Sequence, residues 1–453
     1  MKKFDLIVIG SGSAGSNVMH RATSKGLTVA LAEAGPFGGS CINVGCIPSK
    51  ALIQTARAFN QVKSAGRFGV MAEAPGLDWQ AAIRRKDRIV NRMRAGGYNS
   101  LAENKYVTLF EGEASFAGPR EVLVSGEKIH AERIVIAAGA RPLIPTLEGL
   151  DDIEYLTSTR IMELKELPKS LIVIGSGLIA LEFSQLFTRL GVEVTILQRN
   201  QHLAPQLDQD IAAEIQTILV NEKVKIITGA RVSRVDREDN LIFVDAESNS
   251  KLIRYNAEKL LIATGRKPNS DRLNLDQAGI KADQRGFILV DDHFKTSVEG
   301  IWAIGDIIGG PMFTHKAWHD GYLLANHLID GNAISPAERL IPFAVFTDPE
   351  IAGVGLSESQ ARETDYDYKA KRYPFAAHGR NIVDDKLEGF IKLIYEAGGE
   401  KLLGAQLIGS NASELIHELI AALYFGAKLS DLRNMIHIHP TLAEAINSAA
   451  FSE

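Results

Sequence analysis

The sequence predicts an α/β protein with two Rossmann-like dinucleotide-binding domains and a C-terminal α+β domain. A strand, a glycine-rich turn, a helix and a second strand follow one another near the N-terminus, and the same order returns near residue 175. Strand-like segments at residues 343–355, 389–395 and 402–408 then precede a helix-like segment at residues 413–425. The length of 453 residues fits about three domains.

The first dinucleotide unit starts with an apolar strand at residues 4–9 and turns at Gly10, Gly12 and Gly15. The first glycine permits a tight turn, the second lets the backbone approach a pyrophosphate, and the third lets the helix pack on the strand. The strand after the helix ends at Glu33, where an acidic residue accepts hydrogen bonds from ribose hydroxyls. Together these signals predict a dinucleotide site.

The second unit repeats this order at Gly175 and Gly177, but Ala180 takes the place of the third glycine. Its second strand ends at Gln198 and Arg199 where an acidic residue is expected. A carboxylate there would repel a 2′-phosphate, whereas an arginine pairs with it. The second unit therefore favours NADP; the alternative is that Arg199 is an ordinary solvated arginine.

Each unit is followed by a later strand that ends in glycine, at residues 133–139 and 260–265. These segments are predicted to be the last strand of each nucleotide domain. A further apolar strand delivers Gly305 and Asp306 onto a turn. Asp306 alone would be an ordinary turn residue, but beside two dinucleotide units it is a candidate for holding a second part of a large cofactor.

Cys41 and Cys46 are the only cysteines of the chain, and they precede Pro48 and a predicted helix at residues 49–60. Proline fits the first turn of a helix, and a thiol at a helix N-terminus has a lowered pKa. This spacing predicts a redox-active disulfide with Cys46 as the thiolate. Two buried structural thiols, a structural disulfide and a metal site are the alternatives, and the last lacks further ligands nearby.

The composition is that of an ordinary globular protein, with a formal net charge of −5. This balance gives no basic footprint for nucleic acid, and no apolar run approaches the ~18 residues that span a bilayer. The short N-terminal apolar segment is interrupted by Asp5 and reads as a strand rather than a signal peptide. We expect a cytoplasmic protein.

Taken together, these residues resemble the pyridine nucleotide–disulfide oxidoreductases, which include dihydrolipoamide dehydrogenase, glutathione reductase and mercuric reductase. The resemblance covers essentially the whole chain and includes residues 39–50, both glycine turns, Gly305-Asp306 and residues 437–444. It implies FAD in the first unit, NADP or NAD in the second and a homodimer. The implied segments are a FAD-binding domain at 1–145, an NAD(P)-binding domain at 146–265, a central FAD segment at 266–335 and a dimerisation domain at 336–453.

The resemblance also implies a set of catalytic residues, namely Cys41, Cys46, Lys50, Glu182, His439 and Glu444. Cys46 would lie next to the flavin, and Cys41 would exchange with the substrate. Lys50 would lie near flavin N5 and pair with Glu182 from the helix of the second unit. The alternative for this pair is two surface charges, but each residue lies about one helical turn from a cofactor motif.

His439 would be the acid/base, supplied by the other subunit of the dimer. A histidine titrates near neutral pH and suits the proton transfers that accompany thiol–disulfide exchange. Glu444 could turn back across Pro440 and orient the imidazole. A two-fold interface would allow a C-terminal histidine to reach an N-terminal disulfide in the partner chain.

The cofactor-binding residues follow from the same alignment of motifs, and no metal ligands are predicted. For FAD they are Gly10, Gly12, Ala14, Gly15, Glu33, Ala34, Gly39, Ser40, Lys50, Ala138, Gly139, Gly305, Asp306, His315 and Ala317. For NAD(P) they are Gly175, Gly177, Leu178, Ile179, Glu182, Gln198, Arg199 and Gly265.

The segment around the cysteines, the run at residues 315–317 and the His439–Glu444 pair are most similar to dihydrolipoamide dehydrogenase. The loop at residues 198–200 is more similar to NADPH-using reductases. The leading prediction is a dihydrolipoamide dehydrogenase-like, FAD-dependent oxidoreductase that acts on a sulfur group with NAD(P). Its predicted substrate is a small-molecule thiol or disulfide, with the lipoyl group of a protein as the alternative. The alternative is an NADPH-dependent reductase of a low-molecular-weight disulfide.

Two further alternatives are less favoured. Mercuric reductase carries an extra C-terminal cysteine pair, whereas this chain ends without cysteine and keeps a histidine that mercuric reductase lacks. A FAD-binding redox regulator without turnover would have a damaged dithiol or acid/base site, and both are intact in this sequence. The sequence is compatible with either direction of electron flow and with membership of a multienzyme complex.

Overall fold

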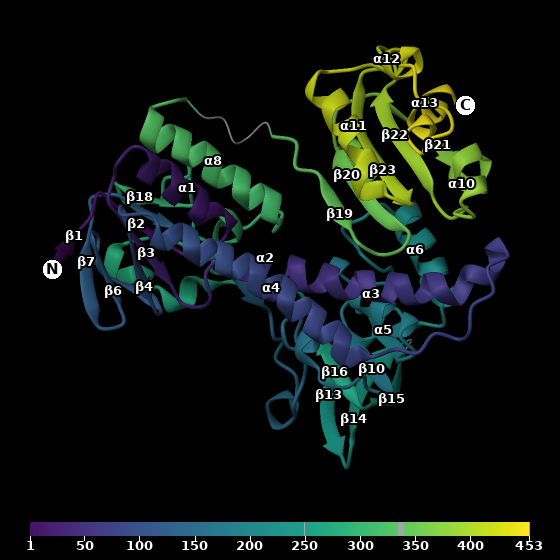
Figure 1. Cartoon of the computed structure of the whole chain (residues 1–453), viewed down its shortest axis with the longest axis horizontal. Helices are drawn as coiled ribbons and strands as arrows, with labels where there is room; N and C mark the ends of the chain where they lie inside the picture. The colour runs from purple at the N-terminus through teal and green to yellow at the C-terminus, as the bar shows by residue number, and fades with distance from the viewer. Residues whose placement is uncertain (249, 334–338, 453) are drawn as a thin grey trace.

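The computed structural model describes residues 1–248, 250–333 and 339–452. Figure 1 shows three parts around the long helix α3 (Cys46–Ser64), with the first part to its left, the second below it and the third above it. This arrangement confirms the predicted α/β fold with two Rossmann-like domains and a C-terminal α+β domain. Among the described residues, no helix is both long and apolar enough to cross a membrane.

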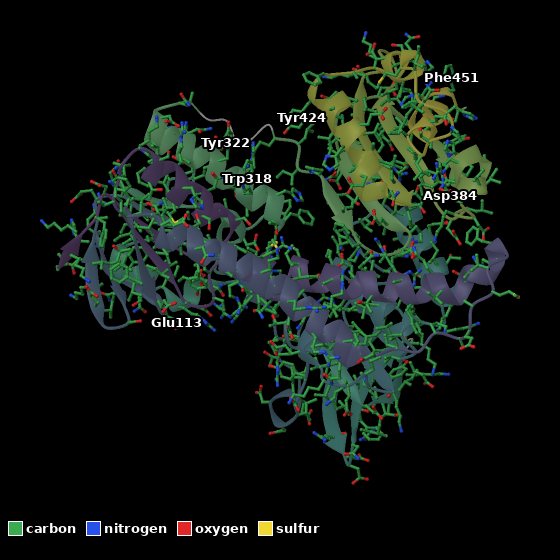
Figure 2. The ribbon with its side chains drawn as sticks, in the orientation of Figure 1. Glu113, Trp318, Tyr322, Asp384, Tyr424 and Phe451 are labelled. Atoms are coloured by element: carbon green, nitrogen blue, oxygen red, sulfur yellow. The ribbon has the colours of Figure 1, made fainter. Side chains whose placement is uncertain are left out.

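The first part is built on a parallel five-stranded sheet in the order β18-β8-β2-β3-β4. Its strands are β2 (Leu6–Ile9), β3 (Val29–Glu33), β4 (Val107–Glu111), β8 (Ile134–Ile136) and β18 (Ile301–Ala303). Helix α1 (Ser13–Ser24) packs against α8 (Thr314–Asp330), so the chain returns to complete this part after building the second. Figure 2 labels Trp318 and Tyr322, two exposed side chains of α8.

Several elements of the first part have no counterpart in the sequence-based predictions. They are the helices α2 (Gly39–Val44), α4 (Trp79–Ala102) and α7 (Leu275–Ala278), and a second sheet of β1 (Lys2–Lys3), β7 (Glu127–His130), β6 (Glu121–Val124) and β5 (Ala114–Gly118). Helix α4 carries charged residues over much of its length and buries only a few side chains, so few apolar residues mark it in the sequence.

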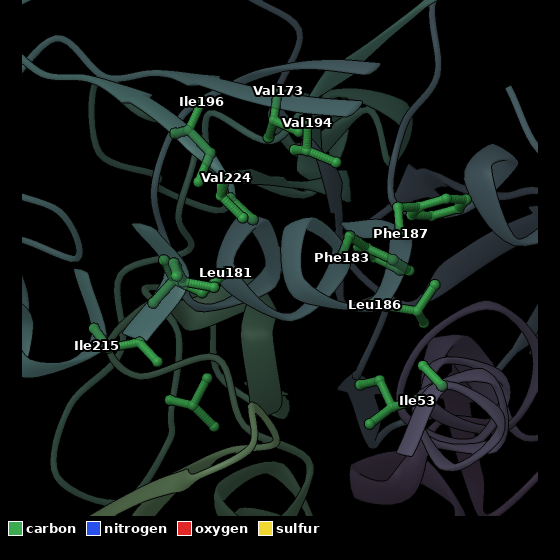
Figure 3. Packing of buried hydrophobic residues seen from close by; sticks show 14 of the residues in the cluster. Ile53, Val173, Leu181, Phe183, Leu186, Phe187, Val194, Ile196, Ile215 and Val224 are labelled. Carbon is green, nitrogen blue, oxygen red and sulfur yellow. The ribbon is translucent and has the colours of Figure 1, made fainter. Parts of the chain in front are cut away.

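The second part repeats the parallel order, as β12-β11-β10-β16, with α5 (Leu178–Arg189) after its glycine turn. The strands of this sheet are β10 (Ser170–Ile174), β11 (Glu193–Leu197), β12 (Lys225–Ile227) and β16 (Lys259–Ile262). Helix α6 (Gln209–Asn221) connects β11 to β12. Between β12 and β16 the chain forms a separate antiparallel sheet of β13 (Arg231–Glu238), β14 (Leu241–Ser248) and β15 (Lys251–Ala257). Figure 3 shows its core, in which Phe183 and Leu186 of α5 lie in the same apolar cluster as Ile53 of α3.

The third part is an antiparallel five-stranded sheet in the order β19-β20-β23-β22-β21, with helices against it. Its strands are β19 (Phe343–Val345), β20 (Glu350–Gly355), β21 (Tyr368–Pro374), β22 (Phe390–Glu396) and β23 (Leu402–Gly409). Its helices are α9 (Glu358–Ala361), α10 (Gly379–Val383), α11 (Ala412–Tyr424), α12 (Leu429–Asn434) and α13 (Glu444–Phe451).

The chain passes between the first two parts through paired strands, β9 (Ala140–Pro142) and β17 (Arg266–Pro268). This crossing lies close to the predicted boundaries at residues 145 and 265, which stay predictions. The predicted boundary between residues 335 and 336 lies outside the described residues.

Helix α3 begins earlier and ends later than the predicted helix at residues 49–60. Cys46 is its first residue, so Pro48 lies in the first turn as expected. Gly45 separates α2 from α3, and a Cβ at this position would lie only 2.8 Å from the carbonyl oxygen of Ser40. The close approach of the two helices therefore requires glycine, and it brings Cys41 on α2 next to Cys46.

Candidate functional site

A cavity of about 1890 Å³ lies where the three parts meet. Its wall includes both cysteines, strand β9 with Arg266 of β17, the turn at Gly175, the N-terminal end of α8, residues 339–344, Phe346 and one face of α11. The cavity therefore joins both dinucleotide units to the cysteine pair, and it is the candidate functional site.

The two thiols are free and half-buried in this cavity. A hydrogen bond with Cys41 is the largest influence that lowers the pKa of Cys46, to about 6, and the Thr314 hydroxyl at 3.3 Å and the charge of Lys50 act in the same direction. Burial and the charge of Glu182 oppose them. The same hydrogen bond, together with burial, raises the pKa of Cys41. These opposite shifts favour ionisation of Cys46 over that of Cys41.

Lys50 and Glu182 form an ion pair at the cavity wall, with Nζ 2.8 and 3.0 Å from the two carboxylate oxygens. The Glu182 side chain is only 8% exposed, so the pair is not two solvated surface charges. Phe346 contacts both partners: its backbone N–H donates to Glu182 Oε1 at 2.9 Å, and its ring centroid lies 4.6 Å from Lys50 Nζ. The pair thus brings together α3, α5 and the third part of the molecule.

The first glycine turn has the shape that an anionic dinucleotide requires. A Cβ at Gly10 would lie 2.4 Å from the carbonyl oxygen of Ala137, and one at Gly15 would lie 2.0 Å from that of Gly10. At Gly12, in contrast, a Cβ would meet nothing within 4 Å, and α1 starts there without a side-chain cap. The free N–H groups of this helix end face open space and fit a pyrophosphate.

The second glycine turn has the same two properties. A Cβ at Gly175 would lie 2.4 Å from the carbonyl oxygen of Ala263, whereas one at Gly177 would meet nothing within 4 Å. Helix α5 also starts without a side-chain cap. Beside this turn Gln198 is buried and accepts a hydrogen bond from the backbone N–H of Arg199, whose side chain is exposed at the cavity wall.

The carboxylate of Glu33 accepts hydrogen bonds from neighbouring residues of the same chain. One carboxylate oxygen accepts from the backbone N–H and the hydroxyl of Ser11, at 2.8 and 2.6 Å, and the other accepts from the N–H of Gly35 at 2.8 Å. A carboxylate has about four acceptor positions, so contact with a ribose stays compatible with this arrangement. The role of Ser11 was not predicted, although it stands between the first two glycines of the motif.

Asp306 lies in the short 3₁₀ helix Gly305–Ile308 that follows strand β18, and burial raises the pKa of its carboxyl group against the opposing charge of Arg266. Behind it, the buried Asp320 accepts from the N–H of Gly305 at 3.0 Å and pairs with Lys316 at 2.8 Å. His315 contacts the carbonyl oxygen of Pro342 at 2.6 Å. Lys316 therefore supports the turn that presents Asp306.

His439 and Glu444 lie elsewhere, on the third part. Their side chains are 3.0 Å apart, and Glu444 also accepts from the N–H of Thr441 at 2.8 Å. The Thr441 hydrogen bond, followed by that of His439, lowers the pKa of Glu444. The His439 side chain is 80% exposed, and neither residue belongs to the wall of the cavity that contains the cysteines.

Most of the predicted site residues converge on the cavity. Those that line it are Ala14, Ser40, Cys41, Cys46, Lys50, Gly139, Gly305, Asp306, His315, Ala317, Gly175, Gly177, Leu178, Ile179, Glu182, Gln198, Arg199 and Gly265. Those outside its wall are Gly10, Gly12, Gly15, Glu33, Ala34, Gly39, Ala138, His439 and Glu444. Within the described parts of the chain, no group of three His, Cys, Asp or Glu side chains could hold a metal ion.

Thr314 and Phe346 are site residues that the sequence analysis missed. Thr314 directly precedes the predicted segment at residues 315–317, so its position was a usable signal. Phe346 lies in an apolar run that predicts only a strand, and nothing local distinguishes it from a core residue.

Comparison with known proteins follows the same division of the chain. Residues 4–321 match the family described as pyridine nucleotide-disulphide oxidoreductase, and residues 341–450 match its dimerisation domain. The chain is 39% identical over 454 residues to a dihydrolipoyl dehydrogenase of Thermus scotoductus, covering 99% of this chain and 97% of that protein. It is 36% identical over 451 residues to a mercuric reductase of Lysinibacillus sphaericus, covering 99% and 82%.

A solved structure is similar over nearly the full length. The HOCl-induced flavoprotein disulfide reductase RclA from Escherichia coli superposes with a TM-score of 0.90 at 32% identity, with 99% of each chain covered. A Cu(II) complex of the same reductase superposes with a TM-score of 0.91.

Proposed function

The chain belongs to the pyridine nucleotide–disulfide oxidoreductase family, a family of flavoproteins that use FAD and NAD(P). From this premise we propose that it passes electron pairs between NAD(P), FAD, the Cys41–Cys46 couple and a dithiol or disulfide substrate. The observation that supports this most is the convergence of the cysteine pair and the Lys50–Glu182 ion pair on one cavity with the two nucleotide units.

The proposed binding of the cofactors rests on the shape of the two glycine turns. The N-terminal end of α1 and Glu33 would hold FAD at the first unit, with Asp306 at its other end. The N-terminal end of α5 would hold the nicotinamide cofactor at the second unit, with Arg199 next to a 2′-phosphate. When bound, FAD supplies the hydride chemistry, and the protein supplies orientation and electrostatics.

The thiol half of the proposed reaction follows from the opposite pKa shifts of the two cysteines. Cys41 must lose its proton before its sulfur attacks a substrate disulfide, which releases one thiol and leaves a mixed disulfide on Cys41. The Cys46 thiolate then attacks the sulfur of Cys41, which forms the Cys41–Cys46 disulfide and releases the second substrate sulfur as a thiolate that takes a proton from solvent. His439, oriented by Glu444, would take the proton of Cys41 and return it to the leaving thiolate.

A homodimer is part of this proposal, because His439 is exposed and belongs to a matched dimerisation domain. Apolar side chains that a single chain leaves uncovered support it. Trp318 of α8 is 50% exposed, and Ile436 and Ile438, close to His439 in the sequence, are 100% and 79% exposed. Burying such side chains between subunits is favourable and would carry a partner's histidine toward the cysteines.

We propose a dihydrolipoamide dehydrogenase-like enzyme that accepts NADP, and a cytoplasmic location where nicotinamide cofactors are available. The second candidate is an NADPH-dependent reductase of a low-molecular-weight disulfide, favoured by the exposed Arg199 at the nicotinamide loop. Reduction of a soft metal ion such as Hg²⁺ is less supported, because Cys41 and Cys46 are the only thiol ligands of this chain.

Steady-state kinetics with the purified protein test the proposal. NADH and NADPH would each be combined with lipoamide, oxidised glutathione and mercuric ion. We expect turnover with a disulfide and a preference for NADPH. A colourless protein unable to take up FAD, or a flavoprotein that reduces none of these disulfides, would contradict the proposal, and an NADH preference above about tenfold would overturn the role of Arg199.

A further inference from the structure

The loop between β19 and β20 in the third part reaches into the redox centre of its own chain. Phe346, the first residue of this loop, lines the same cavity as Cys46. Its backbone N–H binds Glu182 and its ring covers the ammonium group of Lys50, as described above. One residue from a distant domain therefore contacts both members of a buried ion pair.

Two helices fix the position of this loop. On α3, the Arg57 guanidinium donates to the carbonyl oxygen of Thr347 at 2.8 Å and to the carboxylate of Glu350 at 2.9 Å. On α5, the amide of Gln185 exchanges two hydrogen bonds with the backbone of Asp348, at 2.7 and 2.8 Å. Because Lys50 is also on α3 and Glu182 on α5, the loop is anchored to the same two helices that carry the ion pair.

The C-terminal end of this loop is also hydrogen-bonded to α11, through Glu350. Glu350 accepts from the backbone N–H and the hydroxyl of Ser413, at 3.0 and 2.6 Å, in the first turn of that helix. The Glu350 side chain is only 8% exposed, so its charge is matched by Arg57 and by these donors. The segment from Phe346 to Glu350 is thus anchored to α3 through Arg57 and to α11 through Ser413.

We propose that Phe346 is a positioning residue for the Lys50–Glu182 ion pair. Its ring keeps the ammonium group of Lys50 beside the cysteines, and its backbone N–H keeps the carboxylate of Glu182 in reach of that group. The third domain would then serve the redox centre of its own chain through Phe346, in addition to serving the partner's through His439. The inference deepens the proposed function and rests on it.

The physical reason lies in the freedom of the lysine side chain. The Lys50 side chain is 31% exposed, and its flexible stem could swing the charge into solvent. The aromatic face of Phe346, with its centroid 4.6 Å from Lys50 Nζ, attracts the cation electrostatically and so disfavours this movement. Replacing the ring by an aliphatic side chain removes this attraction while keeping an apolar contact.

The test compares Phe346→Leu with Phe346→Tyr, which keeps the aromatic face. Phe59→Leu is the matched control: Phe59 lies on the same helix as Lys50, and Lys63 Nζ is 4.5 Å from its ring, but Phe59 is not in the cavity wall. We expect Phe346→Leu to slow the reduction of the holoenzyme by NAD(P)H about fivefold to tenfold, with an unchanged KM for the disulfide. Phe346→Tyr and Phe59→Leu should behave as the unsubstituted protein.

A second readout does not depend on turnover. The groups that face Cys46 are Cys41 on α2, Lys50 on α3, Glu182 on α5 and the Thr314 hydroxyl on α8. If Phe346→Leu releases the Lys50 charge from this set, alkylation of Cys46 by iodoacetamide, located by peptide mass mapping, shifts to higher pH. In a Lys50→Gln background the Phe346→Leu substitution should cause no further shift, because the cation that the ring holds is gone.

Equal shifts with and without Lys50, or an unshifted profile for Phe346→Leu, would overturn the inference. If Phe346→Leu does not fold, incorporation of pentafluorophenylalanine at position 346 keeps the shape of the ring and removes its attraction for cations, and it should reproduce the shift. A protein without disulfide turnover would contradict the proposed function alone, because the alkylation profiles still report on Phe346.

Discussion

The cysteine centre and the histidine pair are built in opposite ways. Cys46 is half-buried and forms hydrogen bonds with Cys41 on α2 and Thr314 on α8, and the third domain contacts the adjacent Lys50–Glu182 pair. His439 is held by Glu444, only five positions on, and is otherwise 80% exposed. The cysteine centre is therefore assembled from several elements of a single chain, whereas the imidazole of His439 is oriented by Glu444 and lies outside the cavity wall that contains the cysteines.

This difference indicates which properties of the site should depend on a second subunit. The groups that lower the pKa of Cys46, namely Cys41, Thr314 and Lys50, all belong to the same chain, so this lowering should survive dissociation of a dimer. The proton acceptor that Cys41 needs is on a surface that a second copy would cover. Thiolate formation and disulfide turnover should therefore respond differently to loss of the partner.

The largest expected effect is that of Cys46→Ser, which removes the thiolate from the cysteine centre. We expect disulfide or dithiol turnover to fall by roughly 10³-fold or more, because the serine hydroxyl neither forms a disulfide nor ionises near neutral pH. Bound FAD should be retained, as measured by the visible flavin spectrum. Cys46→Ser protein with undiminished turnover would end the proposed role of the pair.

His439→Gln tests the histidine pair, and we expect a loss of about 10²- to 10⁴-fold in turnover, the range for a general acid/base. Mixing this variant with Cys46→Ser decides whether the site is shared. Each inactive chain lacks what the other has, so mixed dimers would contain one intact site, and random reassociation would restore about a quarter of the activity.

Failure of the mixture to regain activity, although mass spectrometry detects mixed dimers, would show that His439 serves its own chain. An active, monodisperse monomer in sedimentation experiments would lead to the same conclusion. Either result would remove the contrast between the two centres.

The nicotinamide loop contains one buried and one exposed residue, since Gln198 is buried, as much of the cysteine centre is, and Arg199 is exposed, as His439 is. Arg199→Ala should raise the KM for NADPH about tenfold and leave that for NADH nearly unchanged, because a charge-assisted hydrogen bond to a 2′-phosphate is worth ~1.5 kcal/mol. Steady-state kinetics with both cofactors measure this, and Arg231→Ala, at another cavity-lining arginine, is the control. Equal changes for both cofactors would contradict the role of Arg199.

The smallest effect is expected for Thr314→Val, which sharpens the account of the cysteine centre. Its hydroxyl, 3.3 Å from Cys46 Sγ, helps to hold the pKa of Cys46 near 6, so its loss should raise that pKa by about one unit. At neutral pH and below, a smaller fraction of Cys46 would then be ionised than in the unsubstituted protein, whereas above pH 8 that fraction would change little. Alkylation rates across this range measure the shift, and Thr314→Ser should restore the original profile.

Much of this site could be predicted from local sequence. The glycine turns and the Cys41–Cys46 segment are short, and each residue in them has a defined task in a turn or at a helix end. The Lys50–Glu182 pairing joined distant residues correctly because each lies about one turn beyond such a motif. Ser11, Thr314 and Phe346 escaped prediction because serine, threonine and phenylalanine are ordinary in a turn, at a helix start and in an apolar strand.

The sequence alone determined the order of the three domains, the two dinucleotide turns and the position of the redox pair, because periodicity, glycine geometry and motif spacing act over a few residues. Only the tertiary structure decided that the Thr314 hydroxyl lies beside Cys46, what surrounds Lys50 and that His439 lies outside the cavity wall. Those properties depend on distances between elements that are far apart in the chain, and burial and electrostatic interactions are set by such distances.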